Sequence, residues 1–141
     1  MLEKKTFISA FKKSRCLVPI SGWYEWKIID DVKQPFFFKH KENQNMFAAG
    51  LYWPRSDGST EFTIITTTAP LEINEVHDRS PLILDDVSMG IWLSDDNPED
   101  IHVNISHDFG HIIENYQVTR SVNNPKNNNA SLIEEFNEVP F

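Results

Sequence analysis

The chain has 141 residues, with 13 Lys and Arg against 21 Asp and Glu, which gives a formal charge of −8 at neutral pH. A hydrophobic content of 40% excludes a fully disordered chain, and the length predicts a single domain with a sizeable core. No apolar run reaches the roughly 18 residues of a membrane span, and the first fifteen residues lack the apolar stretch of a secretory signal. Because its one cysteine cannot form an internal disulfide, we expect a cytoplasmic protein without membrane contact.

The N-terminal residues are basic although the whole chain is acidic. Residues 1–15 carry five bases and one acid, a local charge of +4 that leaves −12 on the remainder. Phe7, Ile8 and Phe11 lie at helical spacing with lysines on the other face, which predicts a short amphipathic helix over 3–13. The acidic total argues against non-specific binding to phosphates. The same total also fits a protein with a basic helix opposite a solvated acidic face. Charge alone therefore does not decide the function.

Strand-like runs follow this helix. Residues 16–19 lead into 22–29, where aromatic side chains favour β structure. The polar residues 30–33 predict a hairpin connection to a strand over 35–38, with Pro35 at its start because proline cannot donate to a strand ladder.

Two further strands are predicted over 46–53 and 62–68, separated by a polar loop over 54–59. The remaining predicted elements are a helix capped by Asp85 or Asp86, a helix that begins at Asn97 and Pro98, a strand over 115–120, a loop over 123–129 and a last helical turn over 131–136. Strands dominate, helices are short and no βαβ alternation occurs. The pattern favours one α+β domain spanning 1–141.

One acidic residue lies within the most aromatic strand. Glu25 stands between Tyr24 and Trp26, and strand alternation places it on the face opposite both. If that face points inward, burial raises the pKa of the carboxyl group and suits it to acid–base chemistry. An outward-facing glutamate on a half-exposed strand is the alternative.

A second candidate group lies in a polar turn. His77 is followed by Asp78 and Arg79, and a histidine beside a carboxylate can exchange protons near neutral pH. Arg79 can pair with Asp78 or reach a phosphate. A plain surface loop is the alternative, and the preceding threonines, including Thr66, fit a strand by propensity alone.

Metal and thiol chemistry have weaker support. His107 and His111 are four residues apart, with His102 nearby, but the sequence between them interrupts a helix and offers no well-placed second acidic ligand. Cys16 is followed by apolar residues, which is typical of a small buried side chain. We therefore expect no metal and no cofactor.

Six strings occur in one order with natural spacing. They are RCLVPISGWYEWK (15–27), QPFFF (34–38), FAAGLYW (47–53), TIITTTAP (63–70), VHDRSPLIL (76–84) and VTRSVNNPKN (118–127). Together they resemble the SOS response-associated peptidase (SRAP) family, whose members shield abasic sites in single-stranded DNA. The pairing of GWYEW with HDRSP is the most specific part, and the resemblance runs from about Lys12 to Glu135.

The resemblance implies a mostly antiparallel, barrel-like β core with peripheral short helices. It also implies that an N-terminal cysteine, exposed by self-removal of methionine, condenses with the abasic aldehyde to a thiazolidine cross-link. Glu25 matches the family's catalytic glutamate, serving the amine, and His77 its catalytic histidine, serving the sugar oxygen. Arg79 matches a DNA-backbone arginine; Trp26 and, with less force, Thr66 match residues beside the DNA.

The chain departs from the family at its N-terminus. A member begins Met-Cys-Gly-Arg and carries an Asn-Ala-Arg-(Ala/Ser)-Glu segment ahead of the part that matches here, whereas this chain begins Met-Leu-Glu-Lys. Cys16 has no free α-amine and cannot replace the nucleophile. We therefore expect an N-terminally incomplete domain, inert in cross-linking, that forms homo-oligomers or exchanges segments through its open strand edges. The alternative is a non-enzymatic DNA-binding or protein-interaction module with the same fold.

Overall fold

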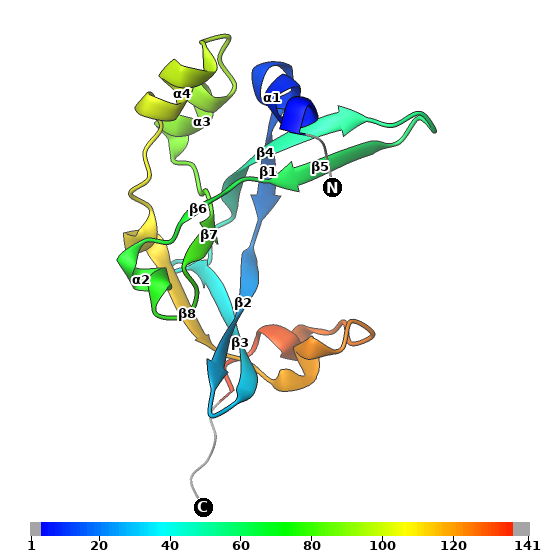
Figure 1. Cartoon of the computed structure of the whole chain (residues 1–141). Coiled ribbons are helices and arrows are strands. Elements are labelled where there is room, and N and C mark those ends of the chain that lie inside the picture. Colours follow the sequence, from blue (N-terminus) through cyan, green and yellow to red (C-terminus); the bar gives the residue numbers. More distant parts are fainter. Residues whose placement is uncertain (1–3, 137–141) are drawn as a thin grey trace, which may run out of the picture.

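The computed structural model describes residues 4–136 (Figure 1). Its helices are α1 (Lys4–Lys13), α2 (Leu71–Asn74), α3 (Asp86–Trp92) and α4 (Pro98–Asn104), with 3₁₀ turns η1 (Gly110–Ile112), η2 (Arg120–Asn123) and η3 (Ala130–Ile133). Its strands are β1 (Arg15–Ile20), β2 (Gly22–Ile29), β3 (Val32–His40), β4 (Met46–Pro54), β5 (Thr60–Ile64), β6 (Thr66–Thr68), β7 (Arg79–Pro81) and β8 (Ile113–Gln117). The α+β class is confirmed. None of the described helices is long and apolar enough to cross a membrane.

The strands form three antiparallel sheets, in the orders β1-β4-β5, β2-β3-β8 and β6-β7. Within residues 4–136 these sheets do not close into a barrel, so the barrel-like part of the expectation differs from the structure. The chain changes sheet at Ser21, between β1 and β2, and this break separates the two larger sheets. In the described part of the chain, no strand pairs with the outer edge of β5 or of β2.

The predicted N-terminal helix forms as α1, while position 3 lies outside the described residues. Phe11 packs edge-to-face on Trp92 of α3, with ring centroids 5.4 Å apart. The Arg15 guanidinium donates to the carbonyl oxygens of Phe11, Trp92 and Ser94. One half-buried cation thus satisfies carbonyl groups at the C-terminal ends of two helices and ties them together.

The predicted hairpin over 30–33 forms as a tight turn between β2 and β3. Asp30 and Asp31 both adopt positive φ, at 49° and 61°, as a two-residue hairpin turn of the twist-matched kind requires. Gly22, at the other end of β2, meets the ring of Phe37 so closely that a Cβ there would lie 2.3 Å from it. Both ends of β2 are therefore held against β3.

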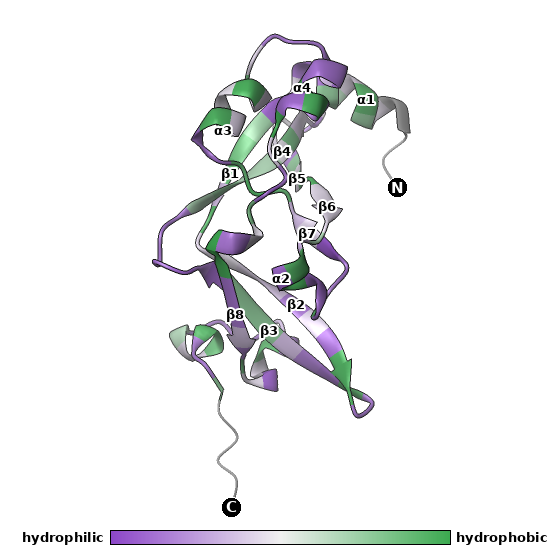
Figure 2. Ribbon diagram, turned by 90° about the vertical axis from the view of Figure 1, so that its left-hand side faces the viewer, coloured by the Kyte–Doolittle hydropathy of each residue, from purple (hydrophilic) through white to green (hydrophobic). Residues whose placement is uncertain are grey.

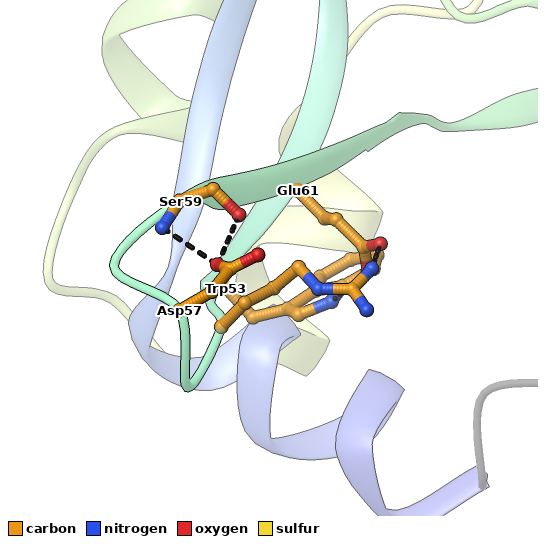
Figure 3. A network of polar contacts seen from close by, with 5 residues as sticks. Trp53, Asp57, Ser59 and Glu61 are labelled. Carbon is orange, nitrogen blue, oxygen red and sulfur yellow. Dashed lines mark hydrogen bonds and ion pairs between the residues drawn. The ribbon is translucent and has the colours of Figure 1, made fainter.

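The predicted loop over 54–59 connects β4 to β5. The Asp57 carboxylate accepts hydrogen bonds from the Ser59 N–H and Oγ at 2.9 and 2.6 Å (Figure 3), and these bonds lower the pKa of Asp57. Beside the loop, Glu61 accepts from Trp53 Nε1 at 2.9 Å and pairs with Arg55. The hydrogen bonds that this aspartate side chain accepts within its own turn thus help to fix the register of the hairpin.

The predicted strand over 62–68 is interrupted at Ile65, where the chain leaves one sheet for another. Three backbone bonds form a closed ring there: Ala49 N–H donates to Leu82, Leu82 N–H to Ile65 and Ile65 N–H to Ala49, at 2.8–2.9 Å. This ring of Ala49, Ile65 and Leu82 attaches the small β6–β7 sheet to β4. This attachment fixes the positions of the residues next to the ring, at the start of β6 and the end of β7.

Both predicted helices of the acidic segment form. The Asp85 carboxylate accepts from the Ser88 N–H at 2.7 Å, as an N-cap does. Asn97 precedes Pro98 at the start of α4 but makes no side-chain cap bond. The predicted late strand over 115–120 lies earlier, as β8, because residues 120–123 coil into η2.

The core lies between the sheets and the α3–α4 pair. Phe38, Ala48, Ile73 and Ile101 are fully buried, and Trp92 is 1% exposed while its Nε1 donates to the Cys16 carbonyl at 2.9 Å. The β2–β3 hairpin lies at one end of the molecule, and α1, α3 and α4 lie at the other (Figure 1).

Candidate functional site

The structure turns the Glu25 side chain inward. Glu25 lies in the middle of β2 on the same face as Trp23, whose ring stacks on buried Phe38 with centroids 5.1 Å apart. The Glu25 side chain is 20% exposed. Burial raises the pKa of Glu25, the charge of His77 lowers it and that of Asp78 raises it. A carboxyl group in this position holds its proton more strongly than one in water, as acid–base work requires.

The structure brings His77 to this carboxylate although 52 positions separate the two residues in the chain. His77 follows α2, and its Nε2 lies 3.8 Å from Glu25 Oε2, within ion-pair range but longer than a direct hydrogen bond. Its Nδ1 lies 3.6 Å from Asp78 Oδ1. The histidine is therefore flanked by two carboxylates.

Backbone groups orient the His77 ring. Nδ1 lies 3.1 Å from the Arg79 backbone nitrogen and 3.0 Å from the Arg79 carbonyl oxygen. A neutral ring accepts from the N–H through Nδ1 and keeps its proton on Nε2, facing Glu25. A charged ring can donate from Nδ1 to the carbonyl instead. Both protonation states thus have a hydrogen-bond partner, which suits a group that cycles between them.

Arg79 and Thr66 lie next to this pair on the small β6–β7 sheet. Arg79 Nη2 donates to the Thr66 carbonyl oxygen at 2.9 Å and to Thr66 Oγ1 at 3.1 Å. Asp78 was one of the two partners considered for Arg79. Its carboxylate lies beside His77, and no Arg79–Asp78 ion pair forms within residues 4–136. The exposed guanidinium is thereby held in place through Nη2, and its other N–H groups make no hydrogen bond to residues 4–136.

Trp26 lies apart from this group because alternation places it on the opposite face of β2. Its ring is 6.4 Å from that of Tyr24, its Nε1 donates to Asn123 Oδ1 at 2.6 Å, and the Lys33 ammonium lies 5.5 Å from its ring. Sequence reasoning missed Asn123 as its partner, since no pattern links positions 97 apart. Four of the five predicted site residues gather, and Trp26 does not.

The histidines considered for metal binding are spread over several segments. The rings of His102 and His107 are 6.0 Å apart, His107 Nδ1 lies 3.3 Å from Thr67 Oγ1, and His111 pairs with Asp108 at 3.5 Å. Within residues 4–136, no three His, Cys, Asp or Glu side chains come close enough together to hold a metal ion.

Cys16 lies in β1 opposite Gly50, and its side chain is half-buried. Burial raises the pKa of its thiol. A raised thiol pKa disfavours the thiolate that acts as a nucleophile. The packing role expected for this cysteine fits its surroundings.

Comparison with known proteins shows the family of the chain that carries this Glu25–His77 arrangement. The family model described as "SOS response associated peptidase (SRAP)" matches residues 1–125. The chain belongs to the SRAP family. Among similar proteins, the abasic site processing protein YoqW of Bacillus subtilis is 39% identical over 140 residues, which cover 94% of this chain and 62% of YoqW. The abasic site processing protein YedK of Escherichia coli is 30% identical, covering 92% of this chain and 61% of YedK.

A solved structure shares the fold of this SRAP chain. A crystallised protein from Bacteroides thetaiotaomicron superposes with a TM-score of 0.81 at 23% identity, covering 95% of this chain and 62% of the other. At that identity the likeness concerns the fold alone. The chain thus spans a little over three-fifths of the length of YoqW and of YedK.

Proposed function

We propose that this chain carries the acid–base pair and part of the DNA-binding surface of an abasic-site processing domain. The observation that carries the proposal is the approach of His77 Nε2 to Glu25 Oε2, at 3.8 Å, in a chain of the SRAP family. The proposed substrate is single-stranded DNA with an abasic site, and the relatives YoqW and YedK are named as abasic site processing proteins. We place the protein in the cytoplasm.

The proposed roles follow from the surroundings of each group. Glu25, whose pKa is raised by burial, accepts and returns protons at the attacking amine. His77, with a backbone partner for either protonation state, serves the ring oxygen of the sugar as it opens. Arg79 offers its exposed N–H groups to a phosphate, and Thr66 positions that guanidinium.

A polypeptide of these 141 residues is proposed to bind this DNA without cross-linking to it. Its single cysteine, Cys16, lies inside β1 with its nitrogen in a peptide bond. A thiazolidine needs a free amine and a thiol on the same residue, so neither the Schiff base nor the ring can form at Cys16. Binding without chemistry is also what the alternative, a DNA-binding module of the same fold, would give.

The test uses three single-stranded oligonucleotides of one sequence, which carry an abasic site, its tetrahydrofuran analogue or an intact nucleotide. We expect binding by fluorescence anisotropy, tighter for the abasic strands, and no adduct on a denaturing gel with or without borohydride trapping. Arg79→Gln should weaken binding, whereas Arg55→Gln, on the distant β4–β5 loop, should not. A covalent band would contradict the proposed inertness, and equal or absent binding to all three strands would contradict the function.

The open strand edges support a proposal about assembly. Within residues 4–136 the outer edges of β5 and β2 are unpaired, and Phe62 on β5 is 61% exposed. Such edges pair with other chains. We propose that the 141-residue chain forms homo-oligomers or exchanges segments with a second copy through these edges. Sedimentation velocity should show mass rising with concentration, and a monomer at all concentrations would contradict this.

A further inference from the structure

The β2–β3 hairpin continues past Glu25 as an exposed surface. Alternation puts Lys27 and Ile29 on the same face of β2 as Glu25, with Ile29 about 13 Å further along the strand. Val32 lies opposite Ile29 across the hairpin. Ile29 and Val32 are 36% and 38% exposed, and Figure 2 shows hydrophobic colour returning near the tip of the hairpin. The acid–base pair thus shares a face with an apolar, solvent-facing patch.

A cavity opens on this patch. It has a volume of about 270 Å³. Its lining residues are Ile29, Asp30, Val32, Gln34, Gln117 and Arg120. The first four residues belong to the β2–β3 hairpin, Gln117 is the last residue of β8 and Arg120 is the first of η2. The site is thus an apolar floor with amide, carboxylate and guanidinium groups around it.

The polar groups of this cavity present hydrogen-bond acceptors to a ligand. Gln34 Nε2 donates to the carbonyl oxygens of Pro35 and Val118, at 3.0 and 2.9 Å. Because only the amide nitrogen can bond two carbonyls, the orientation of this side chain is fixed and Oε1 is left as an acceptor. The Asp30 carboxylate adds a second acceptor. Groups that donate hydrogen bonds therefore match this part of the lining.

We infer that this cavity binds an unpaired nucleobase bearing an exocyclic amino group, from the strand that flanks the reacting nucleotide. Ile29 and Val32 contact the flat face of the base, while Asp30 and Gln34 accept from its amino group, as acidic side chains accept from cytosine N4. Lys27 and Arg120 flank the cavity and contact the phosphates on either side. This inference rests on the proposed function.

Continuity with the Glu25–His77 pair favours a nucleic acid over a protein partner. A strand whose sugar lies at Glu25 and whose phosphate meets Arg79 must continue across some neighbouring surface. Lys27 is the next residue of β2 on the Glu25 side, and Arg120 of η2 lines the cavity beyond it; both side chains are exposed. The acidic turn at Asp30 and Asp31 marks the end of this path, because two carboxylates repel a further phosphate.

The first experiment tests the base preference. The probes are single-stranded dT oligonucleotides with one tetrahydrofuran site, in which the nucleotides on either side are left as dT or replaced by dC. We expect about fivefold tighter binding of the dC probe. Asp30→Asn should abolish this preference. Asp31→Asn removes the same charge from the adjacent turn position, outside the cavity lining, and should keep it. Equal binding of both probes by the unaltered chain would overturn the inference.

The second experiment tests the phosphate contacts. Lys27→Gln should lower the slope of log affinity against log salt by about 0.7, the value for one phosphate on a single strand. Lys41→Gln, an exposed lysine at the other end of β3, should leave the slope unchanged. If neither lysine variant changes the slope while Arg79→Gln does, the hairpin does not contact the DNA, although the proposed function stands. The apolar patch would then bind a protein partner instead. If the unaltered chain binds no DNA, the proposed function itself fails.

Discussion

At the scale of single residues, the properties of Glu25 arise from three opposing influences. Burial raises the pKa of its carboxyl group, the positive field of His77 lowers it, and the negative charge of Asp78 raises it. The His77 and Asp78 charges belong to two side chains, so each can be removed by a single substitution. The pKa of Glu25 thus depends on two side chains of the turn that follows α2.

Removing the neighbours should move the Glu25 pKa in opposite directions. His77→Ala should raise the pKa further, because the stabilising positive charge is lost. Asp78→Asn should lower it, because a repelling charge is lost. The carbon-13 shift of the Glu25 carboxyl group, followed by NMR against pH, measures both. Glu61, which pairs with Arg55 far from the site, is the internal control, and an unmoved Glu25 in both variants would show that the three groups do not interact.

The raised pKa of Glu25 also links stability to pH. A carboxyl group with a higher pKa in the folded than in the unfolded state binds its proton more tightly when folded, so the free energy of unfolding falls as pH rises above the ordinary value of 4.5. Glu25→Gln should remove this decrease. Urea unfolding at pH 4 and pH 7 should show the variant gaining stability relative to the unaltered chain at pH 7. A relative loss at pH 7 would contradict the stated sign.

At the scale of elements, the short helix α3 depends on the residue that caps it. The Asp85 carboxylate accepts from the Ser88 N–H, and this bond lowers the pKa of Asp85. Asp85→Ala should therefore cost about 1 kcal/mol of unfolding free energy. Asp86→Ala, one residue later, loses only a favourable charge in the first turn and should cost less. Equal losses in urea unfolding would mean that the cap bond contributes nothing.

At the scale of the whole molecule, DNA binding has to occur against a net charge of −8. The proposed surface uses only three cations, Arg79, Lys27 and Arg120. A strand that contacts three phosphates should show a slope of log affinity against log salt of about −2. Anisotropy titrations between low and physiological salt measure it. A slope near zero would contradict phosphate binding, and one twice as steep would mean that cations elsewhere, such as those of α1, also take part.

The sequence predicted most elements because their signals are local. The acidic cap of α3 and the aromatic run of β2 each need only neighbouring residues. The division of 62–68 at Ile65 was not predictable, because it depends on backbone bonds to Ala49 and Leu82, which are distant in the chain.

The candidate site shows the same limit. Alternation placed Glu25 opposite Tyr24 and Trp26, but it did not determine which face was inward. The contact with His77 depends on the folding of the whole segment between them. The family resemblance grouped Trp26 with the site, whereas the backbone puts its side chain on the other face, against Asn123. Only the folded structure, and not the motifs, shows that Trp26 lies apart from Glu25 and His77.

The hydrogen-bonded ring of Ala49, Ile65 and Leu82 has a consequence for amide exchange. Each of the three residues donates one bond of the ring and accepts another, so the three bonds are linked, and the neighbouring bond from Leu84 N–H to the Phe47 carbonyl adds to the attachment. Their amide protons should therefore exchange with solvent together, in one cooperative opening. Thr66 and Arg79 lie one and three positions from ring members. Their positions depend on this attachment, so we expect slow exchange of these three protons to report the lifetime of the assembled site.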